Sequence, residues 1–391
     1  MSVSSVQRSV LHLDLDTFFV SVERRKDARL QGLPLIIGGT GDRAVVSACS
    51  YEARVFGIRS AMPMRIAKRL CPHGFYLSGD VDAYLEQSRI ITEIVREKAP
   101  LYEKASIDEF YVEMTGMERF YGCYQWGQEL RQYIMKETGL PLSLGLSVNK
   151  LVSKIATNEA KPNGALHIIA PEIEPFLAPM PVYKIPQIGP KTSRTLAYLG
   201  VRSVATLRQI PADVLERAFG RQGQMLYRRS RGQDDSPVRS DTEQQSMSSE
   251  QTFAQDTIDL HLLQSTIVRM TEALAFRLRQ QDKLTACISV KLRYANFETV
   301  SRQARISYTA RDELLIDKAL HIFERLYQKR VRVRLIGVRL SHLVYGGAQL
   351  ALFQDLPRQS DLYMAIDAIK SRYGGGAVRR ASGIRHLSNR S

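Results

Sequence analysis

Four acidic side chains lie in two apolar segments that have the pattern of β-strands. Residues 9–16, SVLHLDLD, alternate so that Asp14 and Asp16 share one face and leucines occupy the other. Asp108 and Glu109 interrupt the apolar hairpin sequence SIDEFYV. Buried carboxylates are costly unless they are paired or bind a cation, and Mg²⁺ prefers oxygen ligands. The pattern predicts a magnesium site suited to phosphoryl transfer, although solvated acids on a half-exposed sheet would give the same residues.

Three lysines follow in the segment SVNKLVSKIATNEAKPNG. Lys150, Lys154 and Lys161 are four and seven residues apart, so at helical pitch they fall on one face, with the last before a proline at the helix end. Tyr51 and Arg54, in SYEARVFG, add two further groups that could contact phosphate. Beside an acidic metal site, these cations indicate a polyphosphate substrate, whereas a solvated helix face is the alternative.

Two further segments are typical of contacts with a nucleic-acid backbone. IPQIGPKTSRTLAYLGV, residues 185–201, has the spacing of a helix-hairpin-helix, whose backbone N–H groups bind phosphate without reading sequence; its alternative is an ordinary helical turn. In the second segment, VRVRLIGVRL, Arg332 and Arg334 alternate with apolar residues and are expected to face away from the core. With Arg339, and with Arg293 and Arg302 of LRYANFETVSRQ, they would form a basic sheet face, unless they only protect an edge strand.

Residues 349–353, QLALF, form an isolated apolar pentapeptide that follows two glycines. Gln349 is a polar anchor, and Leu350, Leu352 and Phe353 are apolar anchors, which together suit a peptide that docks on a partner. Packing against its own domain is the alternative.

The composition is that of an ordinary globular protein. The chain has 391 residues, of which 44% are hydrophobic and 24% charged, so wholesale disorder, collagen and disulfide scaffolds are excluded. We expect no membrane-spanning helix, because charged residues interrupt every apolar stretch, and no secretory signal. The four cysteines form no C-x-x-C motif, which predicts a reduced, cytoplasmic protein without a zinc site.

The charge is distributed unevenly along the chain. The net charge is +15, and residues 1–182 carry equal numbers of acidic and basic side chains, so the whole excess lies in residues 183–391. The sequence predicts an α/β or α+β domain, with strands and helices interspersed, that extends to about residue 176. A proline-rich boundary follows, and then short helices to residue 231. Residues 232–250 contain almost no large apolar side chain and are predicted to be a linker. The asymmetry predicts a polyanion-binding half joined to a neutral half.

Together these segments resemble the Y-family translesion DNA polymerases, specifically the DinB or DNA polymerase IV branch. The matching segments run in the family's order: LHLDLDTFF, SYEARVFGIRSAMP, SIDEFYV, SLGLSVNKLVSKIAT, AKPNG, IPQIGPKT, LRYANFETVSR and IGVRLS. The resemblance implies an α+β multidomain fold, a right-hand polymerase with a C-terminal α/β little finger. Its parts would be a palm (1–17 and 81–176), small fingers (18–80), a helical thumb with a helix-hairpin-helix (177–231), a linker (232–246), the little finger (247–344) and a tail with a clamp-binding peptide (345–391).

The resemblance also implies roles for residues. Asp14, Asp108 and Glu109 would be catalytic and, with the backbone carbonyl of Leu15, would bind two Mg²⁺ ions, whereas Asp16 holds a position that is usually not a ligand. Phe19 falls at the steric gate against a ribose 2′-OH. The other contacts would be made by Tyr51, Arg54 and Lys161 to the triphosphate, by Ile188, Gly189 and Lys191 to the primer strand, by the five arginines above to DNA, and by Gln349–Phe353 to a sliding clamp. Ala48 stands where many relatives have threonine, which removes one hydroxyl contact to the triphosphate.

The resemblance therefore implies a monomeric, cytoplasmic DNA polymerase of DNA repair, with no membrane partner. It would copy damaged template from dNTPs with low processivity and low fidelity, and so act as a mutator. Two alternatives remain, a non-catalytic scaffold that binds DNA and clamp, and a metal-dependent nuclease with a helix-hairpin-helix. A non-catalytic scaffold would be expected to have lost a metal carboxylate, and all three are present. A nuclease would need neither a triphosphate contact nor a steric gate, yet Tyr51, Arg54 and Phe19 are present. The tail after Phe353 looks helical and basic, and the sequence indicates no role for it.

Overall fold

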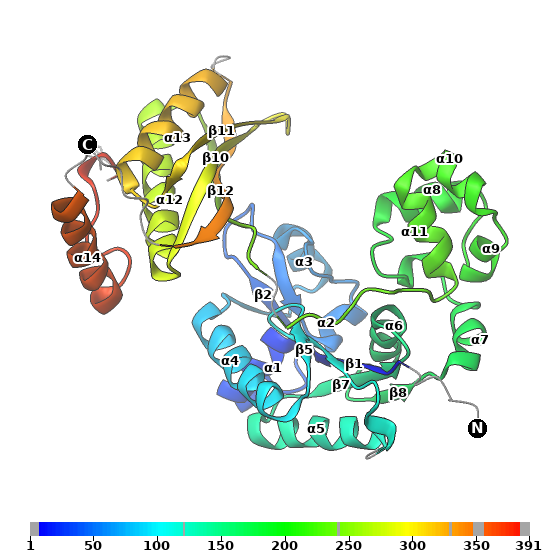
Figure 1. Ribbon diagram of the computed structural model, residues 1–391. Helices are drawn as coiled ribbons and strands as arrows, with labels where there is room; N and C mark the ends of the chain where they lie inside the picture. The colour runs from blue at the N-terminus through cyan, green and yellow to red at the C-terminus, as the bar shows by residue number, and fades with distance from the viewer. Residues whose placement is uncertain (1–7, 120–121, 241–242, 328–330, 347–355, 384–391) are drawn as a thin grey trace. The chain divides into compact units, whose positions relative to one another are not determined.

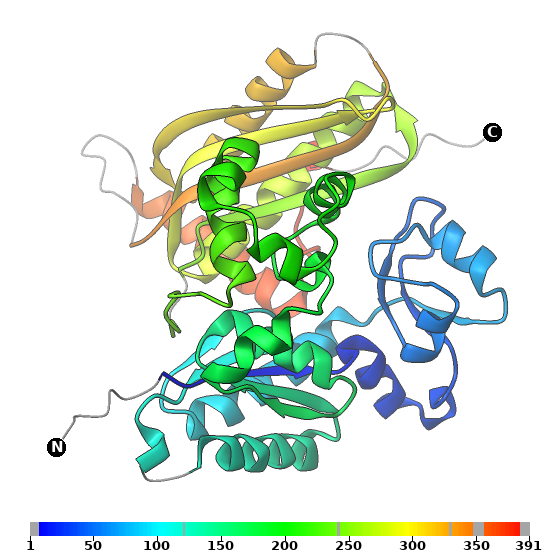
Figure 2. The ribbon, with the colours of Figure 1, turned by 90° about the vertical axis from the view of Figure 1, so that its right-hand side faces the viewer.

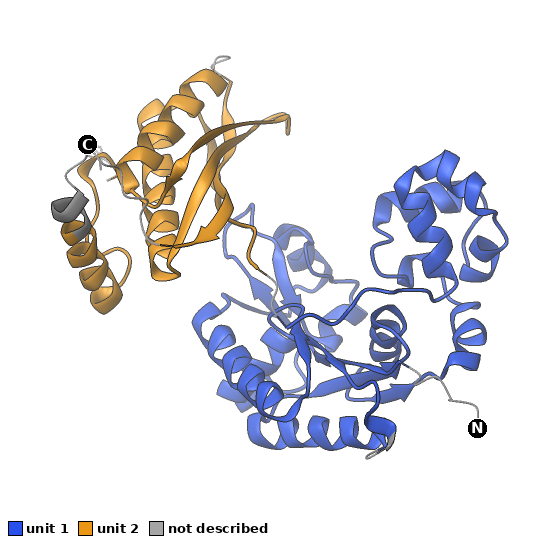
Figure 3. Cartoon of the chain, in the orientation of Figure 1, with its two compact units in different colours: residues 1–242 blue, residues 243–391 orange. Residues whose placement is uncertain are grey.

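The computed structural model describes residues 8–119, 122–240, 243–327, 331–346 and 356–383. The chain divides into two compact units, residues 1–242 and residues 243–391 (Figure 3). Within the described ranges, no helix is both long enough and apolar enough to cross a bilayer.

A five-stranded sheet with β1 (Val10–Leu15) at its centre forms the core of the first unit. Its order is β5 (Tyr102–Lys104), β6 (Glu109–Glu113), β1, β7 (Leu142–Ser147) and β8 (Ala165–His167), with β1 antiparallel to both neighbours. Helix α5 (Cys123–Thr138) lies on one face together with α4 (Val81–Lys98), and α6 (Lys150–Ala160) lies on the other (Figures 1 and 2).

The predicted alternation of β1 separates its two faces. Leu11, Leu13 and Leu15 pack into the apolar cluster shared with α4 and α5, whereas the intervening His12, Asp14 and Asp16 are directed to the opposite face, and all six strand residues are buried. Helix α6 approaches β7 closely on that polar face. A Cβ atom at Gly145 would lie 2.2 Å from the carbonyl oxygen of Ser153, so only glycine permits this approach. The acids of β1 are therefore covered by α6 rather than solvated.

A small three-stranded sheet follows β1 in sequence, with the order β3 (Val46–Cys49), β2 (Leu35–Gly38) and β4 (Phe75–Leu77). Helices α1 (Phe18–Lys26), α2 (Tyr51–Val55) and α3 (Met64–Leu70) accompany it. The Ser50 hydroxyl caps α2 by accepting a hydrogen bond from the Ala53 N–H at 3.2 Å. This cap fixes the start of α2, where Tyr51 lies.

Short helices form the end of the first unit: α7 (Ile173–Leu177), α8 (Pro190–Tyr198), α9 (Val204–Arg208), α10 (Ala212–Phe219) and α11 (Arg221–Ser230). Their buried leucines, Leu196, Leu207, Leu215 and Leu226, form a separate apolar core.

The segment after α11 is attached to the five-stranded sheet rather than free. The Asn149 side chain donates to the carbonyl of Gly232 at 2.7 Å, and the backbone N–H of Arg239 donates to the Glu103 carboxylate at 3.0 Å. Val238 is buried against Val10 and Tyr111. The low apolar content predicted a linker over 232–246, but backbone hydrogen bonds and one valine are sufficient to hold its first residues in place.

The second unit is a four-stranded sheet covered by two helices on one face (Figure 1). Its order is β11 (Thr299–Thr309), β10 (Lys283–Tyr294), β12 (Val333–Tyr345) and β9 (Ser246–Thr257), and the helices are α12 (Leu260–Gln280) and α13 (Asp312–Leu326). Leu274, Ile288, Val290 and Ile336 belong to the core between them.

The tail contains a helix, α14 (Leu356–Tyr373), which an ion-pair network holds to the second unit. The Arg279 guanidinium donates to both carboxylate oxygens of Asp367, at 2.6 and 2.9 Å, and to Asp312 at 2.6 Å. The Arg279 guanidinium also lies 4.7 Å from the ring centroid of Tyr363, which is buried. The predicted docking peptide Gln349–Phe353 lies outside the described residues.

Candidate functional site

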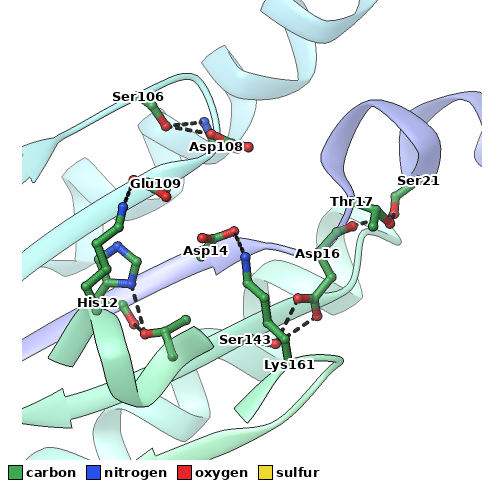
Figure 4. A network of polar contacts seen from close by, with 12 residues as sticks. His12, Asp14, Asp16, Thr17, Ser21, Ser106, Asp108, Glu109, Ser143 and Lys161 are labelled. Carbon is green, nitrogen blue, oxygen red and sulfur yellow. Dashed lines mark hydrogen bonds and ion pairs between the residues drawn. The ribbon is translucent and has the colours of Figure 1, made fainter. Parts of the chain in front are cut away.

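The pairing of β1 with β6 brings together acids that are far apart in sequence. Asp14 is the register partner of Glu109, and the backbone N–H of Leu15 donates to the carbonyl of Asp108 at 3.1 Å. Two adjacent backbones therefore hold Asp14, Asp108 and Glu109 at one end of the sheet (Figure 4), with Leu15 next to Asp14 in the chain. Asp108 is further fixed by Ser106, whose hydroxyl donates to its carboxylate at 2.5 Å.

Lysines at α6 neutralise two of these acids. Lys161, directly after α6, has its Nζ 2.6 Å from Asp14 Oδ1, and Lys154 Nζ lies 2.5 Å from Glu109 Oε2 (Figure 4). Lys150, which the sequence pattern put on the same face, pairs instead with Glu103 at 2.6 Å. An uncompensated buried charge is strongly unfavourable, so these pairs allow the acids to stay beneath α6.

Burial dominates the electrostatics of this end of β1. Desolvation raises the pKa of Asp14 to about 7; the nearby Lys161 ammonium opposes this effect, and the charges of Glu109 and Asp108 reinforce it. Burial and the nearby charges of Lys154, Lys161 and Lys150 hold the pKa of His12 well below its usual value. His12 is therefore neutral, with Nδ1 2.9 Å from the Thr157 hydroxyl.

Asp16 has a different environment from Asp14, although both lie on the same face of the same segment. The Ser143 hydroxyl donates to Asp16 at 2.8 Å, and the backbone N–H of Asn163 donates to it at 2.7 Å. Asp16 thus joins the end of β1 to β7 and to the turn after α6 through these bonds. This environment fits a structural acid better than a ligand.

The donor set at the end of β1 fits a hard divalent cation. Carboxylates of Asp14, Asp108 and Glu109 with the carbonyl of Leu15 offer only oxygen, which suits Mg²⁺. Across the described ranges, no three His, Cys, Asp or Glu side chains are already arranged around a common centre. The ammonium groups of Lys154 and Lys161 instead lie directly against the carboxylates, where they supply the positive charge that a metal ion would supply.

Two aromatic residues from α1 and α2 border this region. The ring of Phe19 stacks on Tyr84, with centroids 4.2 Å apart and planes 9° from parallel. Burial, together with the charge of Asp16, raises the pKa of Tyr51 to about 12, and its hydroxyl has no hydrogen-bond partner among the described residues. The Arg54 guanidinium lies 4.8 Å from the Tyr51 ring centroid. A buried, unpartnered hydroxyl beside a cation is a group prepared to donate to an anionic ligand.

The predicted DNA contacts divide into two groups. In the first unit, Ile188 is buried in the helical core, Gly189 caps α8, and Lys191 is exposed in its first turn. In the second unit, Arg293 and Arg339 follow core residues of their strands and therefore lie on the face opposite the helices.

The remaining predicted arginines do not all share that sheet face. Arg302 pairs with Val290, a core residue, so it belongs to the helix side, at the exposed edge strand β11. Arg332 is exposed and precedes β12, and Arg334 follows its first residue. Arg305, which the sequence analysis did not single out, pairs with Cys287 and is exposed on β11. The alternation in SRQAR, residues 301–305, put Arg302 and Arg305 on opposite faces of a strand, but the register across β10 was needed to decide which face is which.

Comparison with known proteins adds independent information. The sequence matches the impB/mucB/samB family over residues 13–158, the C-terminal domain of that family over 244–352, and the thumb domain of DNA polymerase-iota over 183–234. The Y-family DNA polymerase chimera Dbh-Dpo4(243-245)-Dbh is similar in structure, with a TM-score of 0.76 at 23% identity over 86% of this chain and 100% of that one. This similarity confirms the predicted α+β multidomain polymerase fold.

Two curated relatives cover nearly the full length of this protein. DNA polymerase IV of Xanthomonas axonopodis pv. citri is 39% identical over 363 residues, which are 90% of this chain and 99% of the relative. DNA polymerase IV of Dehalococcoides mccartyi (strain ATCC BAA-2100) is 35% identical over 376 residues, 95% of this chain and 96% of the relative. With the site at the end of β1 and these matches along the whole chain, the protein belongs to the Y-family of DNA polymerases, in the group that contains the DNA polymerase IV enzymes.

Proposed function

We propose that this DNA polymerase adds deoxynucleotides from dNTPs to the 3′-OH of a primer, directed by a template strand. One observation carries the proposal: the acids at the end of β1 and the start of β6 lie beside Lys154 of α6, Lys161 directly after it, and the unpartnered Tyr51 hydroxyl. A metal–triphosphate complex requires carboxylates for its metal ions and cationic or hydroxyl groups for its phosphates, and both kinds of group lie together here. The palm would comprise residues 1–17 and 81–176, the fingers 18–80, the thumb 177–231, the linker 232–246 and the little finger 247–344.

Asp14, Asp108, Glu109 and the Leu15 carbonyl would hold two Mg²⁺ ions. When bound, such ions activate the attacking oxygen and stabilise charge on the leaving phosphate oxygens. Asp14 must lose its proton for this role, and the raised pKa of Asp14 means that deprotonation occurs near neutral pH in the apo site. The Lys161 ammonium stabilises the ionised form of Asp14 in the apo site.

Lys161, Arg54 and Tyr51 would bind the triphosphate. Lys161 pairs with Asp14 in the apo protein, so occupation of the acids by metal would release its ammonium for phosphate. The Arg54 guanidinium lies 4.8 Å from the Tyr51 ring centroid, so a cation and an aromatic hydroxyl residue lie side by side. The chain then contributes mainly by positioning and by electrostatic stabilisation.

Phe19 would exclude ribonucleotides by packing where a ribose 2′-OH would lie. Its stacking on Tyr84 supports the proposal, because the Tyr84 hydroxyl donates to Glu23 at 2.7 Å and so fixes the ring behind Phe19. A ring held in a fixed position distinguishes ribose from deoxyribose by shape better than a mobile side chain does.

The DNA would be bound by backbone groups of Ile188–Lys191 and by arginines of the second unit, including Arg293, Arg302, Arg332, Arg334 and Arg339. The concentration of the +15 net charge in residues 183–391 supports this division.

We further propose that Gln349–Phe353 docks on a sliding clamp and that the enzyme acts as a cytoplasmic monomer in translesion synthesis and DNA repair. Low processivity, low fidelity and a mutator effect would follow from the resemblance to the Y-family, and the short fingers would enclose the base pair only loosely.

A primer-extension assay tests the proposal. The full-length protein, a primer–template with an unpaired template end, each dNTP and Mg²⁺ should give template-directed addition of single nucleotides. EDTA should stop the reaction, and added Mg²⁺ should restore it. Shortening of the primer instead of extension would favour the nuclease, and DNA binding without either reaction would favour the scaffold.

A further inference from the structure

Phe297 is a large apolar side chain that the fold exposes instead of burying. It lies in the turn between β10 and β11, its relative exposure is 63%, and its backbone has a φ of 66°. A left-handed backbone is rare for a bulky residue, and such conformations cluster at functional positions. Since the ring adds little to the core, packing does not account for a phenylalanine here.

The turn presents this ring on a fixed support. The Phe297 N–H donates to the Tyr294 carbonyl at 3.0 Å, and the Tyr294 N–H donates to the Glu298 carbonyl at 2.9 Å. The Ala295 N–H donates to the carbonyl of Arg332 at 2.9 Å, which joins the turn to the residue before β12. Little conformational entropy would therefore be lost when a ligand packs on the ring.

One arginine contacts the ring and two others belong to the same turn region. The Arg334 guanidinium lies 4.6 Å from the Phe297 centroid, and Arg293 donates to the neighbouring Thr299 hydroxyl at 3.0 Å. Arg332, joined to the turn through its carbonyl, is exposed. In the described part of the chain, none of these three arginines forms an ion pair with a carboxylate, so their charge is available to an anionic ligand.

An aromatic ring beside unpaired arginines is the chemistry that binds single-stranded nucleic acid. In a duplex, neighbouring base pairs cover both faces of each base, so only an unpaired base offers a face for stacking. We propose that Phe297 and Arg334 form a platform on which an unpaired base of the template strand stacks while the flanking arginines contact its phosphates. This inference rests on the proposed polymerase function, because primer–template DNA always includes unpaired template bases.

Fluorescence anisotropy of the full-length protein tests the platform with three DNA probes. These are a primer–template with an unpaired 5′ template end, the same duplex with blunt ends, and the single strand. Phe297→Ala should weaken binding to the first and third probes by about 5- to 150-fold and leave the blunt duplex unchanged. The slope of log Kd against log salt should not change, because no phosphate contact is lost, whereas Arg332→Ala should reduce it by about 0.7, the value for one phosphate of a single strand. Phe297→Trp should retain wild-type affinity.

Tyr345→Ala is the matched control. Tyr345 is another exposed aromatic of the second unit, at the other end of β12, with the Lys283 ammonium 4.9 Å from its ring centroid. Its removal should leave the affinity for all three probes unchanged.

Three results would overturn the platform. They are an unchanged affinity of Phe297→Ala for single strands, an equal loss on blunt duplex, and a fall in its melting temperature that accounts for the loss. Primer extension by the wild-type protein tests the polymerase function separately. The anisotropy measurement can therefore contradict the platform without contradicting the polymerase function.

Discussion

Lys161 Nζ lies 2.6 Å from Asp14 Oδ1 and so joins the residue after α6 to the end of β1. In the apo protein the ammonium neutralises an acid that burial alone would keep protonated near neutral pH. The same lysine is placed to move to phosphate once other cations occupy the acid. The proposed metal ligand Asp14 and the proposed triphosphate ligand Lys161 thus neutralise each other when neither metal nor triphosphate is bound. Lys154 neutralises Glu109 in the same way.

Removing the acids should stop chemistry without loss of DNA binding. We expect Asp108→Ala and Glu109→Gln to lower extension to background, because each removes a ligand of the proposed ions, while the Kd for primer–template stays within about twofold. Single-turnover extension and anisotropy measure the two effects. Glu137→Gln, an exposed acid on α5, is the control and should behave as wild type. Near-normal extension by Glu109→Gln would contradict the two-metal assignment.

The raised pKa of Asp14 predicts a pH dependence of stability in metal-free protein. The pKa of Asp14 is about 7 in the folded protein and 3.8 for a free aspartate side chain, so folding favours the protonated form and its contribution to stability is lost as pH rises from 3.8 through 7. Asp14→Asn, which stays neutral, should therefore be more stable than wild type at pH 8, and the difference should shrink toward pH 5. Thermal unfolding in EDTA measures both proteins. A difference that is constant with pH would show that the Asp14 pKa is not raised.

Sugar selection should depend on Phe19 but not on its neighbour. Phe19→Ala should raise the kcat/KM for ribonucleotides by a factor of at least ten relative to dNTPs, because the ring that blocks the 2′-OH is gone. Phe18→Leu is the control, since Phe18 is buried in the core and its replacement should affect stability rather than sugar choice. A stable Phe19→Ala protein with unchanged discrimination would remove the gate from the proposal.

The proposed clamp-binding peptide, Gln349–Phe353, should be needed for clamp-stimulated synthesis but not for basal synthesis. Replacing Leu352 and Phe353 together by alanine should abolish stimulation by the cognate clamp, because the apolar side chains that fill its pocket are lost. Basal extension of a short primer and the melting temperature should not change. Loss of both together would mean that the pentapeptide packs against its own domain.

The tail helix should stabilise the second unit. Asp367→Asn weakens the bidentate contact that Arg279 makes with α14 and should destabilise α14 by about 1.5–3 kcal/mol, the range for hydrogen bonds to charged groups. Limited proteolysis should then cleave within residues 356–383 sooner than in wild type. Asp361→Asn, exposed on the same helix, is the control. Equal cleavage rates in all three proteins would show that the network does not hold α14.

Local sequence determined much of the candidate site. The alternation in SVLHLDLD predicted β1 and the common face of its polar residues, because side chains in a strand alternate whatever surrounds them. The spacing of Lys150, Lys154 and Lys161 likewise predicted a shared direction, since helical pitch is a local property. The resemblance to the Y-family, carried by motifs along the whole chain, supplied the family that the relatives then confirmed.

Only the tertiary structure decided which charges meet. The antiparallel register of β1 and β6 sets Asp14 opposite Glu109, and the close approach of α6 over Gly145 brings Lys154 to Glu109 while Lys150 goes to Glu103. Strand register also put Arg302 on the helix side, against the expected common face of the arginines. Long-range contacts hold residues 232–239 against the sheet and α14 against Arg279. None of these pairings can be derived from local pattern, because each depends on the distance between residues that are remote in sequence.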